Sequence, residues 1–74
     1  MSDFPEPSWQ DIQLFLEKEG FVEIKFDENW YVFMQKDKKN VRIPKLSIIF
    51  RPCLESIIQA SDIDEKIFLE ALRK

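Results

Sequence analysis

The N-terminal part of the chain has the pattern of one amphipathic helix. Apolar residues recur there at the spacing of a single helix face, at Trp9, Ile12, Phe15 and Leu16. Ser8 and Asp11 stand three positions apart, as in a capping box, where each side chain satisfies a backbone N–H that the helix start leaves free. Gly20, the only glycine of the chain, can take the left-handed conformation that ends a helix. The pattern therefore predicts a helix that opens at Ser8 and is ended by Gly20.

From residue 21 the period of the apolar positions changes from helical to alternating. Apolar and charged residues take turns at Val22, Glu23, Ile24, Lys25, Phe26 and Asp27. Such alternation predicts a strand with one face in water and the other in the core. We therefore expect Val22 and Ile24 to be buried.

Two further strands are predicted after the first. Residues 30–35 alternate again but have apolar or aromatic side chains on both faces, as in a central strand. Residues 40–43 form a third, short strand that Pro44 ends, because proline cannot donate a hydrogen bond to a sheet. The links between the strands are short and polar, so the pattern predicts an antiparallel meander.

The last third of the chain is predicted to be helical. Pro52 suits the first turn of a helix that runs to about Ala60. A second helix restarts at Asp64, a good N-cap, and Ile63 can pack on Phe68 across its first turn. The buried set predicted for the whole chain comprises Ile12, Phe15, Leu16, Val22, Ile24, Val32, Leu54, Ile57, Phe68 and Leu72.

These elements predict a small α+β fold. The order α-β-β-β-α, with one short additional helix, is typical of a two-layer arrangement in which a three-stranded antiparallel sheet carries its helices on one face. Residues 1–7, with two prolines, are expected to form a flexible arm, and residues 8–74 a single domain. A chain of 74 residues buries only about 60% of its unfolded surface, so a partner or a second copy would add stability.

Charge is distributed unevenly along the chain. The net charge is −3, but residues 36–45 hold five basic residues and one acid, so this segment carries +4 and the rest carries −7. A basic strip on an acidic body can contact phosphate or an acidic protein. The same residues also suit a soluble turn or an edge strand that is protected against pairing. The basic residues of the strip are Lys36, Lys38, Lys39, Arg42 and Lys45.

The composition argues against several classes of protein. No apolar run is longer than five residues, so none is long enough to cross a membrane, and the acidic N-terminus lacks the features of a secretory signal. The single cysteine, Cys53, cannot form an internal disulfide, and the chain has no histidine with which to build a Cys/His zinc cluster. We therefore expect a cytoplasmic protein without metal or cofactor. Cys53 suits a core position, with a redox or nucleophilic role as the alternative.

Several stretches together resemble the HicA family, also called YcfA-like. They are "FLEKEGF" at 15–21, "VRIP" at 41–44 and "LESIIQASDIDEKIFLEAL" at 54–72, and the resemblance extends over about residues 9 to 72. The family consists of small endoribonucleases of toxin–antitoxin pairs, with a fold like that of double-stranded-RNA-binding domains. The resemblance implies this fold, an RNA substrate and a HicB-like antitoxin as partner.

The chain departs from the family at the catalytic turn. HicA proteins have a Gly-Ser/Thr-X-His-like turn between the first two strands, and in this sequence Trp30 stands in place of the histidine. An indole has one N–H donor and no basic nitrogen, and losing general acid–base catalysis typically costs about 10²–10⁴-fold in rate. A substitute site would need Asp27 or Glu28 as base, with Lys25 or Lys36 stabilising the phosphorane. The resemblance therefore implies the fold more strongly than the ribonuclease activity.

The leading hypothesis is a non-catalytic HicA-like binding module, a protein-interaction component of a diverged toxin–antitoxin pair. Its partner would be a HicB-like antitoxin or a second copy of the chain. An altered HicA-type endoribonuclease toxin (mRNA interferase) and a plain RNA-binding domain are the alternatives. The predicted surface combines the basic strip with aromatic and apolar residues, namely Trp30, Tyr31, Ile49 and Phe50.

Two parts of this predicted surface have an alternative interpretation as packing. Trp30 either packs half-buried on the sheet or anchors a partner, as exposed tryptophans often do. Residues 47–50, "SIIF", either close the end of the fold or form an interface, because three large apolar residues in a row cannot all face one side of a short connection.

Overall fold

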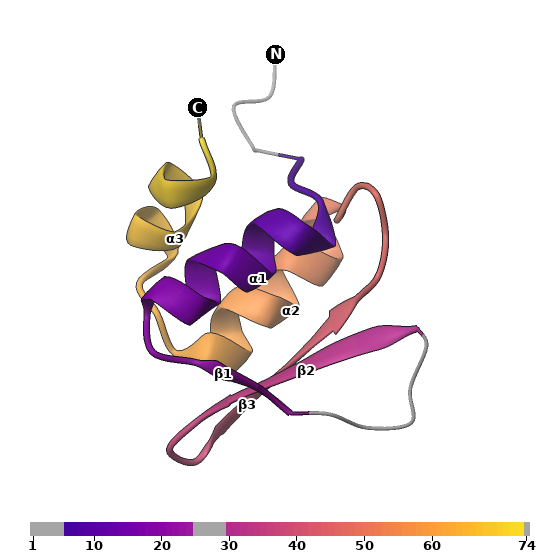
Figure 1. Ribbon diagram of the computed structural model, residues 1–74. Coiled ribbons are helices and arrows are strands. Elements are labelled where there is room, and N and C mark those ends of the chain that lie inside the picture. The colour runs from indigo at the N-terminus through magenta and orange to yellow at the C-terminus, as the bar shows by residue number, and fades with distance from the viewer. Residues whose placement is uncertain (1–5, 25–29, 74) are drawn as a thin grey trace.

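The computed structural model describes residues 6–24 and 30–73. Within these residues the chain forms helices and strands in the predicted order, so the α+β class is confirmed (Figure 1). Residues 1–5 of the expected arm, the predicted strand beyond residue 24 and the turn at 27–29 lie outside the described residues. The elements are α1 (Trp9–Lys18), β1 (Val22–Ile24), β2 (Tyr31–Lys36), β3 (Lys39–Pro44), α2 (Arg51–Ser61) and α3 (Glu65–Leu72).

Helix α1 begins and ends as predicted. The Ser8 Oγ accepts a hydrogen bond from the Asp11 N–H at 3.3 Å, and the Asp11 carboxylate accepts one from the Ser8 N–H at 3.1 Å, which completes the capping box. Gly20 has a φ of 99°, and the N–H of Phe21 donates to the carbonyl of Leu16 at 2.9 Å. This is the hydrogen bond of a Schellman motif, and it turns the chain from α1 directly into β1.

The sheet is the predicted antiparallel meander. Its strands lie in the order β1-β2-β3, and β2 pairs with β3 over six residues from Tyr31 opposite Pro44 to Lys36 opposite Lys39. Asp37 and Lys38 connect the two strands, and Asp37 has a positive φ of 54°. Aspartate tolerates this conformation better than most residues, so the tight turn fits the sequence.

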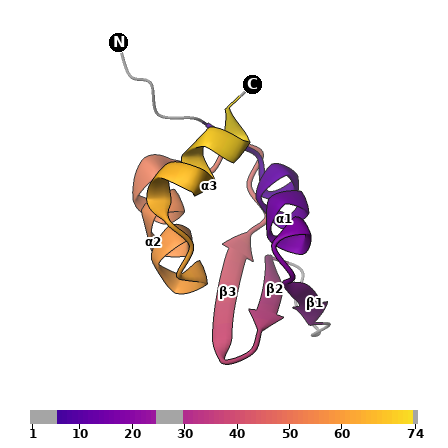
Figure 2. The same cartoon turned by 90° about the vertical axis from the view of Figure 1, so that its left-hand side faces the viewer.

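All three helices lie on the same side of the sheet, as predicted (Figure 2). Helices α1 and α2 contact the strands, whereas α3 lies across α1 and α2 on their side away from the sheet. Helix α2, expected only as a short additional helix, contacts the sheet beside α1. Helix α3 therefore packs against the other two helices.

The core lies between the sheet and the helices, and most of the predicted buried set is confirmed. Leu72 is only partly buried and packs against the edge of the core, as does Ile63. The side chains of the core are Ile12, Phe15, Leu16, Phe21, Val32, Met34, Val41, Ile43, Ile49, Leu54, Ile57, Ile58 and Phe68.

The predicted orientation of β1 is wrong. Val22 is 61% exposed and Ile24 is only partly buried, while Phe21 is buried. The Schellman turn directs Phe21 into the core, and side chains alternate along a strand, so Val22 and Ile24 must point the other way. Glu23 then lies on the helix side of the sheet, where its carboxylate accepts a hydrogen bond from the Gln13 amide at 2.9 Å in solvent.

Candidate functional site

The face of the sheet opposite the helices carries an apolar and aromatic surface, which we call the outer face. The register places Ile24, Phe33 and Arg42 in one row across the three strands. Helices α1 and α2 lie on the other side of the sheet (Figure 2), and of the two only α2 borders this surface, along β3. The side chains of the outer face are Val22, Ile24, Tyr31, Phe33, Gln35, Asn40, Arg42 and Pro44.

Aromatic contacts order the centre of the outer face. The rings of Tyr31 and Phe33 lie 6.3 Å apart between centroids, and the Arg42 guanidinium lies 4.8 Å from the centroid of the Tyr31 ring. This distance is within the range of a cation–π contact. Arg42 is the one charged side chain among the eight of the outer face, so the surface has a single positive charge in an apolar and amide setting.

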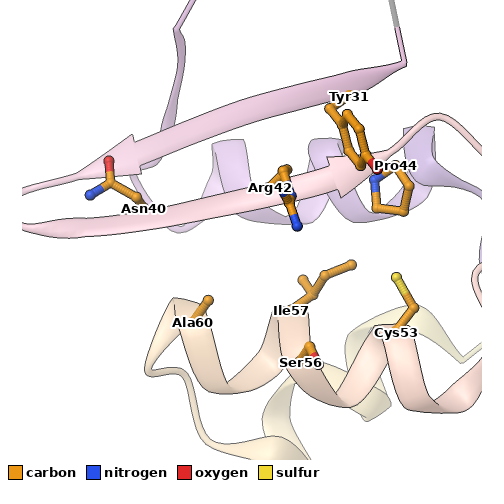
Figure 3. A pocket seen from close by; sticks show the side chains of 8 residues that line it. All are labelled: Tyr31, Asn40, Arg42, Pro44, Cys53, Ser56, Ile57 and Ala60. Carbon is orange, nitrogen blue, oxygen red and sulfur yellow. The ribbon is translucent and has the colours of Figure 1, made fainter.

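A groove of about 410 Å³ runs between β3 and α2 and adjoins the outer face. Figure 3 shows Cys53, Ile57 and Ala60 on the side of α2 that faces β3. The opposite wall consists of Asn40, Arg42 and Pro44 with Tyr31, and Ser56 completes the lining. The groove joins one strand edge to one helix face, and its helix side has no charge.

Most residues of the predicted basic strip make contacts within the protein. The Lys36 Nζ donates to the carbonyl of Glu19 at 2.7 Å and so binds the end of α1. Lys39 forms an exposed ion pair with Asp62 at 3.4 Å, and the Lys45 Nζ lies 5.7 Å from the Trp9 ring centroid. Lys38 is exposed in the hairpin turn.

The basic strip does not surround a single surface. Lys36, Lys38 and Lys39 lie at the turn of the β2–β3 hairpin, whereas Lys45 lies at its other end. Five residue steps along β3 separate these ends, a distance of about 17 Å at the rise of a strand.

Trp30 is 74% exposed, so its interpretation as a half-buried residue packed on the sheet is wrong. Its carbonyl accepts a hydrogen bond from the Lys45 N–H at 2.8 Å, which places it at the end of the hairpin where the chain leaves for α2. Exposed apolar side chains follow in that connection, at Leu46, Ile48 and Phe50.

Ile49, by contrast, is fully buried, and its N–H donates to the carbonyl of Pro7 at 2.7 Å. It was predicted to contact a partner, and in this fold it cannot, because its side chain belongs to the core. Phe50 is 61% exposed and remains available. Both interpretations of the segment 47–50 therefore apply in part: Ile49 packs in the core, whereas Ile48 and Phe50 are exposed.

Cys53 lies half-buried in the groove. Burial raises the pKa of its thiol above the ordinary value, and the nearby charge of Arg42 opposes this rise without cancelling it. A thiol with a raised pKa is a weaker nucleophile at neutral pH, because only the thiolate reacts. Cys53 thus contributes a small apolar side chain to the lining of the groove.

Of the residues considered for a substitute ribonuclease site, the structure describes only Lys36. Lys25, Asp27 and Glu28 lie outside the described residues, and Lys36 is bound to the end of α1. Within residues 6–24 and 30–73 no cluster of three or more His, Cys, Asp or Glu could hold a metal ion.

Comparison with family models, with curated proteins and with solved structures found no match. The resemblance to HicA proteins therefore stays a hypothesis that rests on the residues quoted above. No helix in the described part of the chain is long and apolar enough to cross a membrane.

The sequence did not reveal two parts of this site. Val22 and Ile24 were assigned to the core, and the groove residues Asn40, Ser56 and Ala60 had no signal of their own. The strand 30–35 did carry a signal for the outer face, since Tyr31 and Phe33 are aromatic on the side that a two-layer sheet leaves open.

Proposed function

We propose that this chain is a non-catalytic protein-binding module, which binds a partner protein through the outer face of its sheet. One observation carries the proposal: Val22 is 61% exposed on a face where Ile24, Tyr31 and Phe33 are each partly exposed beside it. Contiguous apolar surface of this kind usually marks a contact with another protein. In line with the resemblance to HicA proteins, the proposed partner class is a HicB-like antitoxin.

RNA is a less suitable partner for the same surface. Tyr31 and Phe33 could stack on bases, but non-specific affinity for nucleic acid comes mainly from Lys and Arg that neutralise phosphates. The outer face has one such residue, Arg42, and the lysines at the hairpin turn include two that contact Glu19 and Asp62. The net charge of −3 adds a general repulsion.

The test is capture of a partner from the native host, followed by reconstitution with the purified partner. Val22→Lys and Phe33→Lys would each place a charge on the outer face, and each should abolish capture and raise the Kd at least about tenfold. Leu14→Lys is the matched control, because Leu14 is an exposed apolar residue of α1 on the helix side. A partner that binds both outer-face variants as tightly as wild type would contradict the proposal.

A further inference from the structure

The outer edge of β3 has free backbone hydrogen-bonding groups. Lys45 N–H donates to the Trp30 carbonyl, and hydrogen-bonded pairs alternate along an antiparallel ladder, so Val41 and Ile43 direct their backbone groups toward β2. Asn40 and Arg42 therefore direct their N–H and C=O groups away from the sheet. Within the described residues no hydrogen bond reaches these four groups. The edge is thus a template on which another strand can pair.

The groove between β3 and α2 begins at this free edge. Its helix wall is formed by Cys53, Ser56, Ile57 and Ala60, at positions i, i+3, i+4 and i+7 of α2, which is one continuous helix face. Ser56 and Ala60 are small and exposed, so they leave room beside the strand. Figure 3 shows this helix wall facing Asn40 and Arg42 across the groove.

We propose that an extended, acidic segment of a partner protein adds to the edge of β3 as a fourth strand and lies in the groove against α2. This inference rests on the proposed protein-binding function and specifies how the partner is held. The Asn40 and Arg42 backbone groups form the ladder with the segment. Its alternate side chains contact Ile57 and the Tyr31 ring, which line the groove.

The charge of the site selects an acidic segment. Of the basic strip, Lys39 and Arg42 lie on β3 itself, while the helix wall of the groove is uncharged. Among the described residues Lys39 pairs with the exposed carboxylate of Asp62, a weak surface contact that a carboxylate of the segment can replace. Acidic side chains on the added strand would therefore find a complementary charge at Lys39 and at Arg42.

The same charges disfavour a second copy of the chain as the occupant. Pairing β3 with β3 of another molecule would bring the basic side chains of two identical edges together, and like charges opposite each other destabilise a sheet. Lysine on an edge strand is a common guard against such pairing. The basic residues of β3 therefore oppose pairing with a second copy of this chain but not with an acidic strand.

The experiment uses peptides of about eight residues, in which Val alternates with Asp or Glu, added to the isotope-labelled full chain. We expect amide shifts at Asn40, Arg42 and along the α2 wall, and slower hydrogen exchange of the Asn40 and Arg42 amides. A charge-reversed peptide with Lys in place of the acids should bind at least about tenfold more weakly. N-methylation of every second peptide bond should abolish binding when it blocks the amides that face β3. It should leave binding unchanged when it blocks the other set, because only one set of amides faces β3.

Two variants of one helix locate the peptide. Ala60→Trp fills the groove and should abolish binding, whereas Gln59→Trp places the same ring on an exposed position outside the groove lining and should leave binding unchanged. Hydrogen–deuterium exchange of α2 verifies that both variants are folded. If the acidic peptide does not bind, if it binds Ala60→Trp as well as wild type, or if both N-methylated forms bind equally, the strand addition is refuted.

The outcome is separable from that of the proposed function. Strand addition would be refuted, and the proposed protein-binding function retained, by two results together. Capture of the partner would depend on Val22 and Phe33, and the acidic peptides would not bind in the groove. Concentration-dependent dimerisation that Ala60→Trp abolishes, with no binding of the acidic peptide, would refute the acidic occupant in favour of a second copy.

Discussion

Phe15 and Phe68 pack edge to face, with ring centroids 4.7 Å apart and an angle of 64° between the rings. Phe15 belongs to α1 and Phe68 to α3, and both side chains are in the core. Since α3 contacts helices and no strand among the described elements, this aromatic pair is a principal attachment of α3 to the rest of the fold.

Replacing Phe68 by Ala should therefore release α3 and destabilise the whole domain. Truncation of a buried Phe typically costs about 3–5 kcal/mol, a large share of the stability of a small domain. Urea denaturation measures the loss, and Ile67→Ala on the exposed face of the same helix should change the free energy of unfolding by no more than about 0.5 kcal/mol. Equal effects of the two substitutions would show that α3 is not held by its buried ring.

The two neighbours Ile49 and Phe50 should respond oppositely to a charge. Ile49→Asp places an unpaired carboxylate in the core, which should cost more than about 4 kcal/mol and unfold the protein. Phe50→Asp changes a side chain that is 61% exposed, so the melting temperature should shift little. A thermal melt of each variant distinguishes them, and a folded Ile49→Asp protein would contradict the burial described here.

The elements that were predicted correctly depend on local interactions. The Ser8–Asp11 capping box and the Gly20 turn involve residues a few positions apart, so the sequence alone contains their full physical cause. The orientation of β1 does not follow from alternation, because a period of two has two phases. Phe21, placed by the turn at Gly20, selects the phase that exposes Val22.

The candidate site was harder to predict because it arises from the packing of distant segments. The groove exists only because α2 lies beside β3, and no pattern within either segment states that they are neighbours. The sequence named Tyr31 and Arg42 as candidate binding residues, but did not indicate that the guanidinium lies over the ring. Ile49 was misassigned because three consecutive apolar residues do not reveal which of them points inward.

The proposed function predicts that the purified protein leaves RNA intact. If the resemblance to HicA ribonucleases holds, Trp30 stands in place of their catalytic histidine, and its indole cannot accept a proton. Incubation with single-stranded and structured RNA should give no product above a buffer control, and expression should not arrest growth. Cleavage that is lost in Asp27→Ala or Glu28→Ala, with the fold retained, would establish a substitute active site instead.

The thiol of Cys53 should react slowly with an alkylating reagent such as iodoacetamide. Burial raises its pKa above that of a free thiol, so at about pH 8 the folded protein has less thiolate than the urea-unfolded chain and should be modified more slowly. The pKa of Cys53 is lower in the unfolded chain than in the folded one. Ionisation of this thiol should therefore lower the free energy of unfolding as the pH rises above the pKa of the unfolded chain.

Arg42→Gln provides the control for this interpretation. The charge of Arg42 partly opposes the effect of burial, so its removal should raise the pKa of Cys53 further and slow alkylation again. A mass-spectrometric time course over a series of pH values measures both proteins, with unfolded chain as the reference. If Arg42→Gln instead accelerates the reaction at every pH, the residue acts by covering the thiol in the groove rather than by its charge.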